Sequence, residues 1–169
     1  MTISIEPVDK AVARKVFTRP AWLLAYGLGA GLSPLAPGTI GSIMGLLLWI
    51  PLSWLPVWQY LLTLAGICAL GVLVSDQVSR EMGKADPGGI VIDEIAGILM
   101  TLFLVPQVWY WILAAFVIFR LLDIIKPWPI GLADRQLKGG IGIMVDDLLA
   151  GAMGLVLIQG MVYLQLTFA

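Results

Sequence analysis

Charged side chains are confined to three clusters along the chain, and long apolar stretches separate these clusters. Positions 20–75, 95–119 and 148–169 contain no Asp, Glu, Lys or Arg. Moving a charge from water into hydrocarbon costs kilocalories, so this segregation predicts membrane segments that alternate with aqueous ones. Of the 169 residues, 60% are hydrophobic and only 12% are charged, outside the usual range of soluble globular proteins. We therefore expect a single membrane-embedded domain over residues 1–169.

The apolar stretches predict an all-α, polytopic membrane bundle of about five membrane helices, preceded by an N-terminal interfacial segment. Residues 1–19 are expected to form an amphipathic lead whose lysines and arginines can face anionic lipid headgroups. Residues 21–32 are too short to span the bilayer and predict an interfacial or half-inserted helix. The membrane helices are expected to begin near positions 39, 57, 90 and 143, with one more that ends near Lys126. A polar loop is expected over residues 130–142.

Residues 95–119 allow two topologies. One continuous span would put the acidic residues at its two ends on opposite sides of the membrane. A hairpin that turns at Val105, Pro106 and Gln107 would return both ends to one side. Pro106 and the aromatic cluster at 109–111 favour the hairpin. All charged clusters then lie on one face, and their lysines and arginines predict that this face is cytoplasmic.

Two absences restrict the chemistry. The chain has no histidine, which excludes mechanisms that need an imidazole nucleophile or base. Its single cysteine, Cys68, lies inside an apolar stretch, whereas a reactive thiolate needs an electropositive and partly hydrated site. We therefore interpret Cys68 as a packing residue. The net charge of −1 gives no reason to expect a nucleic acid partner, and nothing in the sequence implies a protein partner.

Five carboxylates border the apolar segments. Asp93 and Glu94 are predicted in the first turn of one helix, Asp146 and Asp147 in the first turn of another, and Asp123 at the end of a third. Oxygen ligands without His or Cys suit a hard cation such as Mg²⁺. Acidic residues in a first helical turn also stabilise the helix by interacting favourably with its dipole. Helix capping therefore remains open as an alternative to metal binding for each pair.

Basic residues beside these acids could bind phosphate. Arg120, Asp123 and Lys126 are spaced to lie along one helical face. Arginine offers a planar fork for phosphate oxygens, and lysine offers a point charge. A local ion pair at the end of a membrane helix is the alternative.

Four further residues are candidates for substrate binding. Thr39 and Ser42 follow the Gly/Pro-rich stretch 33–38 and could present hydroxyls at a helix N-terminus, where anions are favoured. Close packing of small residues between helices is the alternative there. Arg135 in the polar segment and Trp128, which lies between two prolines, are expected near a lipid headgroup.

Four segments resemble motifs of the bacterial phosphatidylglycerophosphatase A family, in order and over nearly the whole chain: residues 31–42, 92–97, 119–129 and 139–147. The resemblance implies a Mg²⁺-dependent lipid phosphatase that converts phosphatidylglycerol phosphate to phosphatidylglycerol at the inner membrane. It places the five carboxylates on the acidic motif positions, and Arg120 and Lys126 on the basic ones. Ile92 stands where some members have tryptophan.

Two other functions fit parts of the pattern. A CDP-alcohol phosphatidyltransferase also uses aspartates and Mg²⁺ at the membrane edge, but its diagnostic run of residues is missing here. A small ion or proton transporter would use buried acids, but it would place them in the middle of membrane helices, whereas these are predicted at helix ends.

Overall fold

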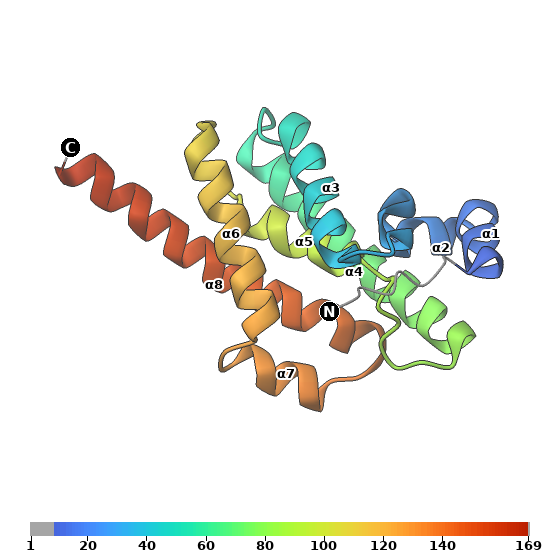
Figure 1. Ribbon diagram of the computed structural model, residues 1–169. Coiled ribbons are helices and arrows are strands. Elements are labelled where there is room, and N and C mark those ends of the chain that lie inside the picture. Colours follow the sequence, from blue (N-terminus) through green and yellow to red (C-terminus); the bar gives the residue numbers. More distant parts are fainter. Residues whose placement is uncertain (1–8, 169) are drawn as a thin grey trace.

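The computed structural model describes residues 9–168, and every regular element in that range is helical (Figure 1). In chain order the helices are α1 (Lys10–Thr18), α2 (Pro20–Ala25), the 3₁₀ helix η1 (Gly27–Leu32), α3 (Pro37–Leu52), α4 (Val57–Met82), α5 (Ile92–Thr101), α6 (Trp109–Ile125), α7 (Ile130–Gln136) and α8 (Gly139–Phe168). Figure 1 shows the long helix α8, with α6 beside it and α7 next to its first turns.

Two of these helices, α4 with 26 residues and α8 with 30, are long and apolar enough to cross a membrane. Both expose large apolar side chains, among them Leu62 and Leu73 on α4 and Val156 on α8. The shorter helix α3 is also apolar. The predicted count of five membrane helices is not confirmed, because α5 has only 10 residues and is about 15 Å long.

Helix α5 lies in the centre of the bundle, where it packs against α3, α4, α6 and α8. Nearly all its side chains are buried, including those of Ile95, Ile98 and Leu99. The predicted turn at 105–107 is confirmed, since α5 ends at Thr101 and α6 begins at Trp109. The first turn of α5 and the last turn of α6 therefore lie at the same end of the bundle.

Two glycines bring α5 and α8 into backbone contact. A Cβ atom on Gly151 would lie 2.5 Å from the carbonyl oxygen of Gly97. The Thr101 hydroxyl donates to the Gly97 carbonyl (3.1 Å) and the Gly151 carbonyl (3.3 Å), so it ties the two helices together at this crossing. Any larger side chain at position 151 would push the helices apart.

The N-terminal lead packs on the protein as well as presenting charge. Asp9 caps α1 by accepting from the Ala11 amide (2.8 Å), and Val16 on α1 is fully buried. Arg19 donates to Glu81 near the end of α4 (2.6 Å), so it is engaged within the molecule. Residues 21–32 form only short helices, as predicted, and positions 1–8 of the lead lie outside the described residues.

The prediction of a polar loop over residues 130–142 is wrong. Residues 130–136 form α7, which buries Ile130 completely. Helix α8 begins at Gly139, four residues before its predicted start, because its glycines pack closely on α4. A Cβ atom on Gly140 would collide with the Val72 carbonyl and lie 2.8 Å from the Asp76 backbone nitrogen.

Candidate active site

Three carboxylates from two helices converge at the end of the bundle where α5 and α8 begin. Oxygens of Asp93, Glu94 and Asp147 all lie within 4.8 Å of one another. Asp93 is 9% exposed and Asp147 is 3% exposed. Burying three like charges together is costly unless a cation or protons compensate them.

The donor atoms of this carboxylate triad fit a hard metal ion. Glu94 Oε2 and Asp147 Oδ2 are buried and accept no hydrogen bond from the described residues. Buried polar atoms are nearly always satisfied, and an oxygen-only ligand set is the one that Mg²⁺ prefers. Asp93 Oδ1 accepts from the Glu94 amide (3.1 Å), which holds the first turn of α5 in place. The triad could therefore hold a divalent cation.

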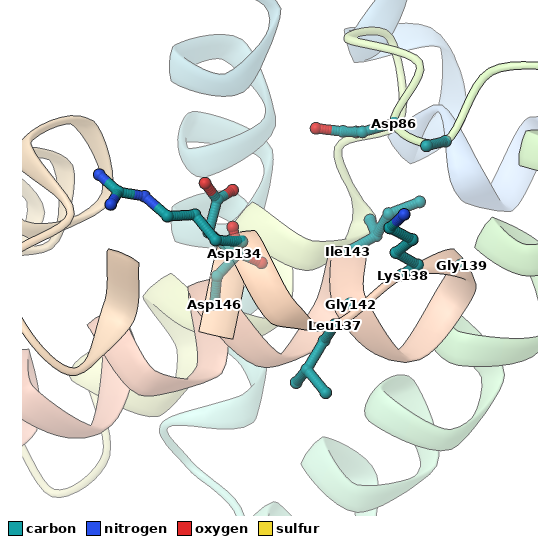
Figure 2. Close-up of a pocket in the computed structure, with 10 residues that line it drawn as sticks. Asp86, Asp134, Leu137, Lys138, Gly139, Gly142, Ile143 and Asp146 are labelled. Carbon is teal, nitrogen blue, oxygen red and sulfur yellow. The ribbon is translucent and has the colours of Figure 1, made fainter. Parts of the chain in front are cut away.

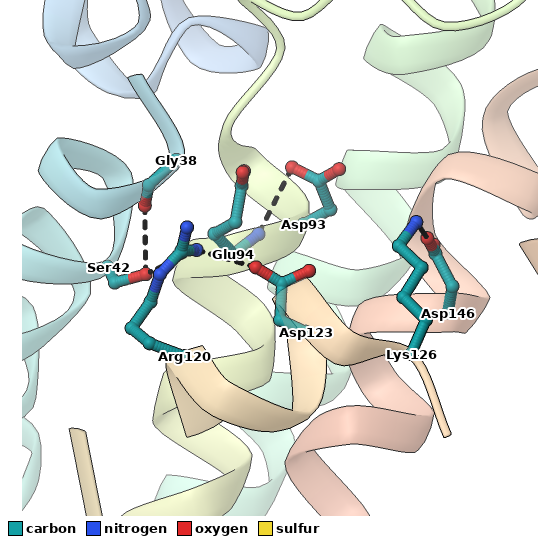
Figure 3. Close-up of polar contacts among 8 residues, drawn as sticks. All are labelled: Gly38, Ser42, Asp93, Glu94, Arg120, Asp123, Lys126 and Asp146. Carbon is teal, nitrogen blue, oxygen red and sulfur yellow. Dashed lines mark hydrogen bonds and ion pairs between the residues drawn. The ribbon is translucent and has the colours of Figure 1, made fainter. Parts of the chain in front are cut away.

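Helix α6 supplies an arginine beside the triad. Figure 3 shows Arg120 between Asp123 and Ser42. Its Nη1 donates to Asp123 Oδ2 (2.6 Å) and to the Ser42 hydroxyl (3.3 Å). Its Nε is buried and has no hydrogen-bond partner among the described residues. Asp123 and Ser42 thus hold the guanidinium through its Nη1, and the Nε donor has no partner among the described residues and could meet an anion.

The start of α3 packs against Glu94 and Arg120. A Cβ atom on Gly38 would collide with the Glu94 carboxylate and would lie 3.2 Å from Arg120 Nη1. Only glycine leaves space there, so the absence of a side chain is what admits both charged groups. The Ser42 hydroxyl donates to the Gly38 carbonyl (2.9 Å), which orients its oxygen toward Arg120.

Lys126 and Asp146 form a separate ion-pair network next to the triad. Lys126 ends α6 in a left-handed conformation, and its Nζ donates to Asp146 on α8 (2.6 Å) and to Asp134 on α7 (2.5 Å). Burial by itself would lower the pKa of Lys126, but the hydrogen bonds from its ammonium to the two carboxylates outweigh burial and raise the pKa above its ordinary value. The lysine therefore stays charged and joins three helices.

A polar cavity of about 160 Å³ opens beside Asp146 (Figure 2). It lies between the 85–86 loop, α7 and the first turns of α8, and Asp86, Asp134 and Arg135 line it. Asp146 Oδ1 is buried and has no hydrogen-bond partner in the part of the chain that the structure describes. The cavity borders the triad, because Asp146 lines the cavity and directly precedes Asp147 of the triad.

The structure brings most of the predicted site residues together, but not all. Asp146 and Asp147 lie about two turns inside α8, so the first-turn position predicted for them is wrong and helix capping does not explain them. Thr39 is half-buried in the first turn of α3, and no hydrogen bond joins its side chain to the site residues described here. Trp128 is 79% exposed.

Sequence reasoning missed Asp134, which shares Lys126 with Asp146. Asp134 lies in the segment predicted to be a loop, where a carboxylate usually faces water. Asp134 lies four residues after Ile130, on the same helical face, so no separate polar face in this short helix could have indicated it.

Comparison with known proteins finds relatives that match most of the chain. The family model described as phosphatidylglycerophosphatase A matches residues 23–162. The phosphatidylglycerophosphatase A of Escherichia coli is 46% identical over 156 residues, which cover 90% of each chain. That of Haemophilus influenzae is 42% identical over 149 residues, 87% of this chain and 91% of the relative. No solved structure matches.

Proposed function

The chain belongs to the phosphatidylglycerophosphatase A family, and we propose that it hydrolyses the terminal phosphomonoester of phosphatidylglycerol phosphate to phosphatidylglycerol and phosphate. The observation that carries the proposal is the buried Asp93–Glu94–Asp147 triad beside an arginine that has an open donor. An enzyme of this family is a phosphatase, and a lipid substrate agrees with the two helices able to cross a membrane.

The proposed cofactor is Mg²⁺, with Asp93, Glu94 and Asp147 as its ligands. Bound there, the ion would neutralise phosphate oxygens and activate or orient a water molecule. Asp123 and Asp146 remain proposed ligands that are also engaged in ion pairs, with Arg120 and Lys126 respectively. The unpartnered Oδ1 of Asp146 supports that part of the proposal.

Arg120 is proposed to bind the phosphoryl group during the reaction. Asp123 and Ser42 hold Nη1, so the guanidinium is oriented before substrate arrives. Its buried Nε–H can then donate to a phosphate oxygen, whose charge redistributes as the ester bond breaks. A donor fixed in advance stabilises that charge without reorganisation, which is how such groups lower a barrier.

The remaining predicted substrate contacts form an outer layer in this proposal. Arg135 lines the polar cavity next to Asp146, where it can meet the headgroup. Lys126 contributes by holding Asp146, in addition to its proposed attraction for phosphate. Thr39 and Trp128 are proposed to contact the substrate from α3 and from the exposed surface.

The proposed location is the bacterial inner membrane, with the active site on the cytoplasmic face. The charged clusters and the candidate site lie at the same end of α5, α6 and α8, which supports a site at the membrane surface. No specific observation favours a phosphatidyltransferase or an ion transporter, and the family match supports phosphoester hydrolysis over both.

Phosphate release by the purified protein in detergent tests the proposal. We expect release from phosphatidylglycerol phosphate in Mg²⁺, little release from phosphatidic acid, and none when a chelator is present. Asp76→Asn is the control variant, since Asp76 pairs with Arg80 outside the site. Equal turnover of both lipids would overturn the proposed substrate, and full turnover in excess chelator would overturn the metal.

A further inference from the structure

Asp134 on α7 shares Lys126 with Asp146, the residue that directly precedes Asp147 of the carboxylate triad. The Lys126 ammonium donates to Asp134 Oδ1 (2.5 Å) and to Asp146 Oδ2 (2.6 Å). A lysine ammonium carries three donors at the end of a flexible stem, so a single carboxylate would not fix its position. Because Asp134 binds it as well, the ammonium is held on the Oδ2 side of Asp146.

The packing of α7 places Asp134 beside this lysine. A Cβ atom on Gly131 would lie 2.7 Å from the Lys126 carbonyl oxygen, so the start of α7 lies directly against the end of α6. Ile130 is fully buried, and α7 also packs on the first turns of α8. Residues three and four apart share a helical face, so Asp134 lies on the same packed face as Gly131 and Ile130. The place of Asp134 is therefore set by the packing of α7.

The exposure of the three side chains shows where this network acts. The exposed fraction falls from 40% at Asp134 to 29% at Lys126 and 11% at Asp146. An ion pair as exposed as that of Asp134 contributes little to the stability of a fold. Asp146 Oδ1, in contrast, is buried and has no hydrogen-bond partner among the described residues. The consequence of holding Lys126 thus falls on a carboxylate that borders the triad.

We propose that Asp134 is a positioning residue, which holds Lys126 on Oδ2 of Asp146 and so leaves Oδ1 free for the cation. The inference rests on the proposed function, since it assumes Mg²⁺ bound by the triad and Asp146. Without Asp134, the charge of Lys126 is balanced by Asp146 alone, and the ammonium can meet both oxygens of that carboxylate. Lysine then competes with the cation for Asp146. Partners that orient metal ligands typically change metal affinity by about 10- to 100-fold.

Thermal unfolding of the whole protein in detergent, at increasing Mg²⁺ concentration, tests the proposal. For Asp134→Asn we expect a given rise in melting temperature to need about tenfold more Mg²⁺ than for wild type. In chelator the two proteins should melt together, because the lost ion pair is exposed. An unchanged Mg²⁺ requirement would overturn the proposal. Failure of Asp134→Asn to fold would show a structural role and would overturn it as well.

Asp86→Asn is the matched control for the loss of one negative charge. Asp86 lines the same cavity as Asp134 but forms no ion pair with another described residue. We expect Asp86→Asn to keep the Mg²⁺ requirement of wild type, and Asp134→Glu, which keeps the carboxylate, to keep most of its affinity. An equal shift in Asp86→Asn and Asp134→Asn would show a general effect of charge, against a role of Asp134 in holding Lys126.

A double variant tests whether Asp134 acts through Lys126. Lys126→Met removes the ammonium and keeps an unbranched stem, so adding Asp134→Asn in this background should not change the Mg²⁺ requirement further. Additive effects of the two substitutions would contradict the proposal. In steady-state kinetics, excess Mg²⁺ should restore the turnover of Asp134→Asn to near wild type, whereas a structural defect would persist at every Mg²⁺ concentration. Failure of the proposed function gives a different result, because wild type would then release no phosphate and gain no stability from Mg²⁺.

Discussion

Gly97 on α5 and Gly151 on α8 meet in backbone contact, each one helical turn beyond a carboxylate of the triad. Asp93 precedes Gly97 by four residues, and Asp147 precedes Gly151 by four. Because residues four apart lie on the same helical face, the crossing at the two glycines places the two aspartates opposite each other. The geometry of the carboxylate triad is therefore set by a contact that carries no charge.

Substitution at this crossing should separate the carboxylates. Gly151→Ala puts a methyl group 2.5 Å from the Gly97 carbonyl oxygen, so α8 has to shift. We expect a loss of about 1–3 kcal/mol in the free energy of unfolding, typical of overpacking, and at least about tenfold lower turnover. Gly160→Ala is the matched control, since a Cβ atom there meets nothing within 4 Å. Wild-type turnover in Gly151→Ala would show that the crossing does not position the site.

Neutralising the triad should separate metal binding from folding. Asp93→Asn and Asp147→Asn each remove one of three buried like charges, so we expect both variants to be at least as thermally stable as wild type in chelator. Added Mg²⁺ should raise the melting temperature of wild type but not of the variants, since a ligand that binds only the folded state stabilises it. Thermal unfolding in detergent measures this. An equal rise in all three proteins would place the ion elsewhere.

Arg120 variants should distinguish catalysis from a local ion pair. Arg120→Lys keeps the charge but loses the fork, and we expect kcat to fall more than apparent affinity, because the contact strengthens in the transition state. If Arg120 only neutralises the charge of Asp123, the double variant Arg120→Ala/Asp123→Ala should regain the turnover that either single change lost. Steady-state kinetics of the single and double variants decide between these outcomes, and recovery in the double variant would exclude a catalytic role.

Accessibility labelling tests the membrane orientation. In a Cys68→Ala background, cysteines placed at positions 86 and 138 should react with impermeant reagents from the cytoplasmic side only. Both positions border the polar cavity beside Asp146, so they should label from the same face. A cysteine at position 56, in the turn between α3 and α4, should be reachable only from the other side. Labelling of 86 and 138 from opposite faces is incompatible with the fold.

Local sequence signals determined the helical class, several helix boundaries and the acidic residues of the site. Sequence signals predict a membrane helix that begins near position 57, where the structure has Val57–Met82. Pro56 precedes this helix and Gly83 ends it. Pro106 marks the turn between α5 and α6 for the same kind of reason, since proline cannot continue a helix. These signals act within a few residues, so they can be read without the fold.

Tertiary packing decided what local signals could not. Glycines 139, 140 and 142 look like a loop in sequence, yet they lie in α8. Gly139 and Gly140 lie so close to Val72 and Asp76 of α4 that a small residue is favoured there. Some partners of the basic residues are also distant in sequence. Arg120 contacts Ser42, 78 positions away, and Lys126 contacts Asp146, 20 positions away. Contacts between distant segments depend on how helix faces pack, and no periodicity within one segment specifies them.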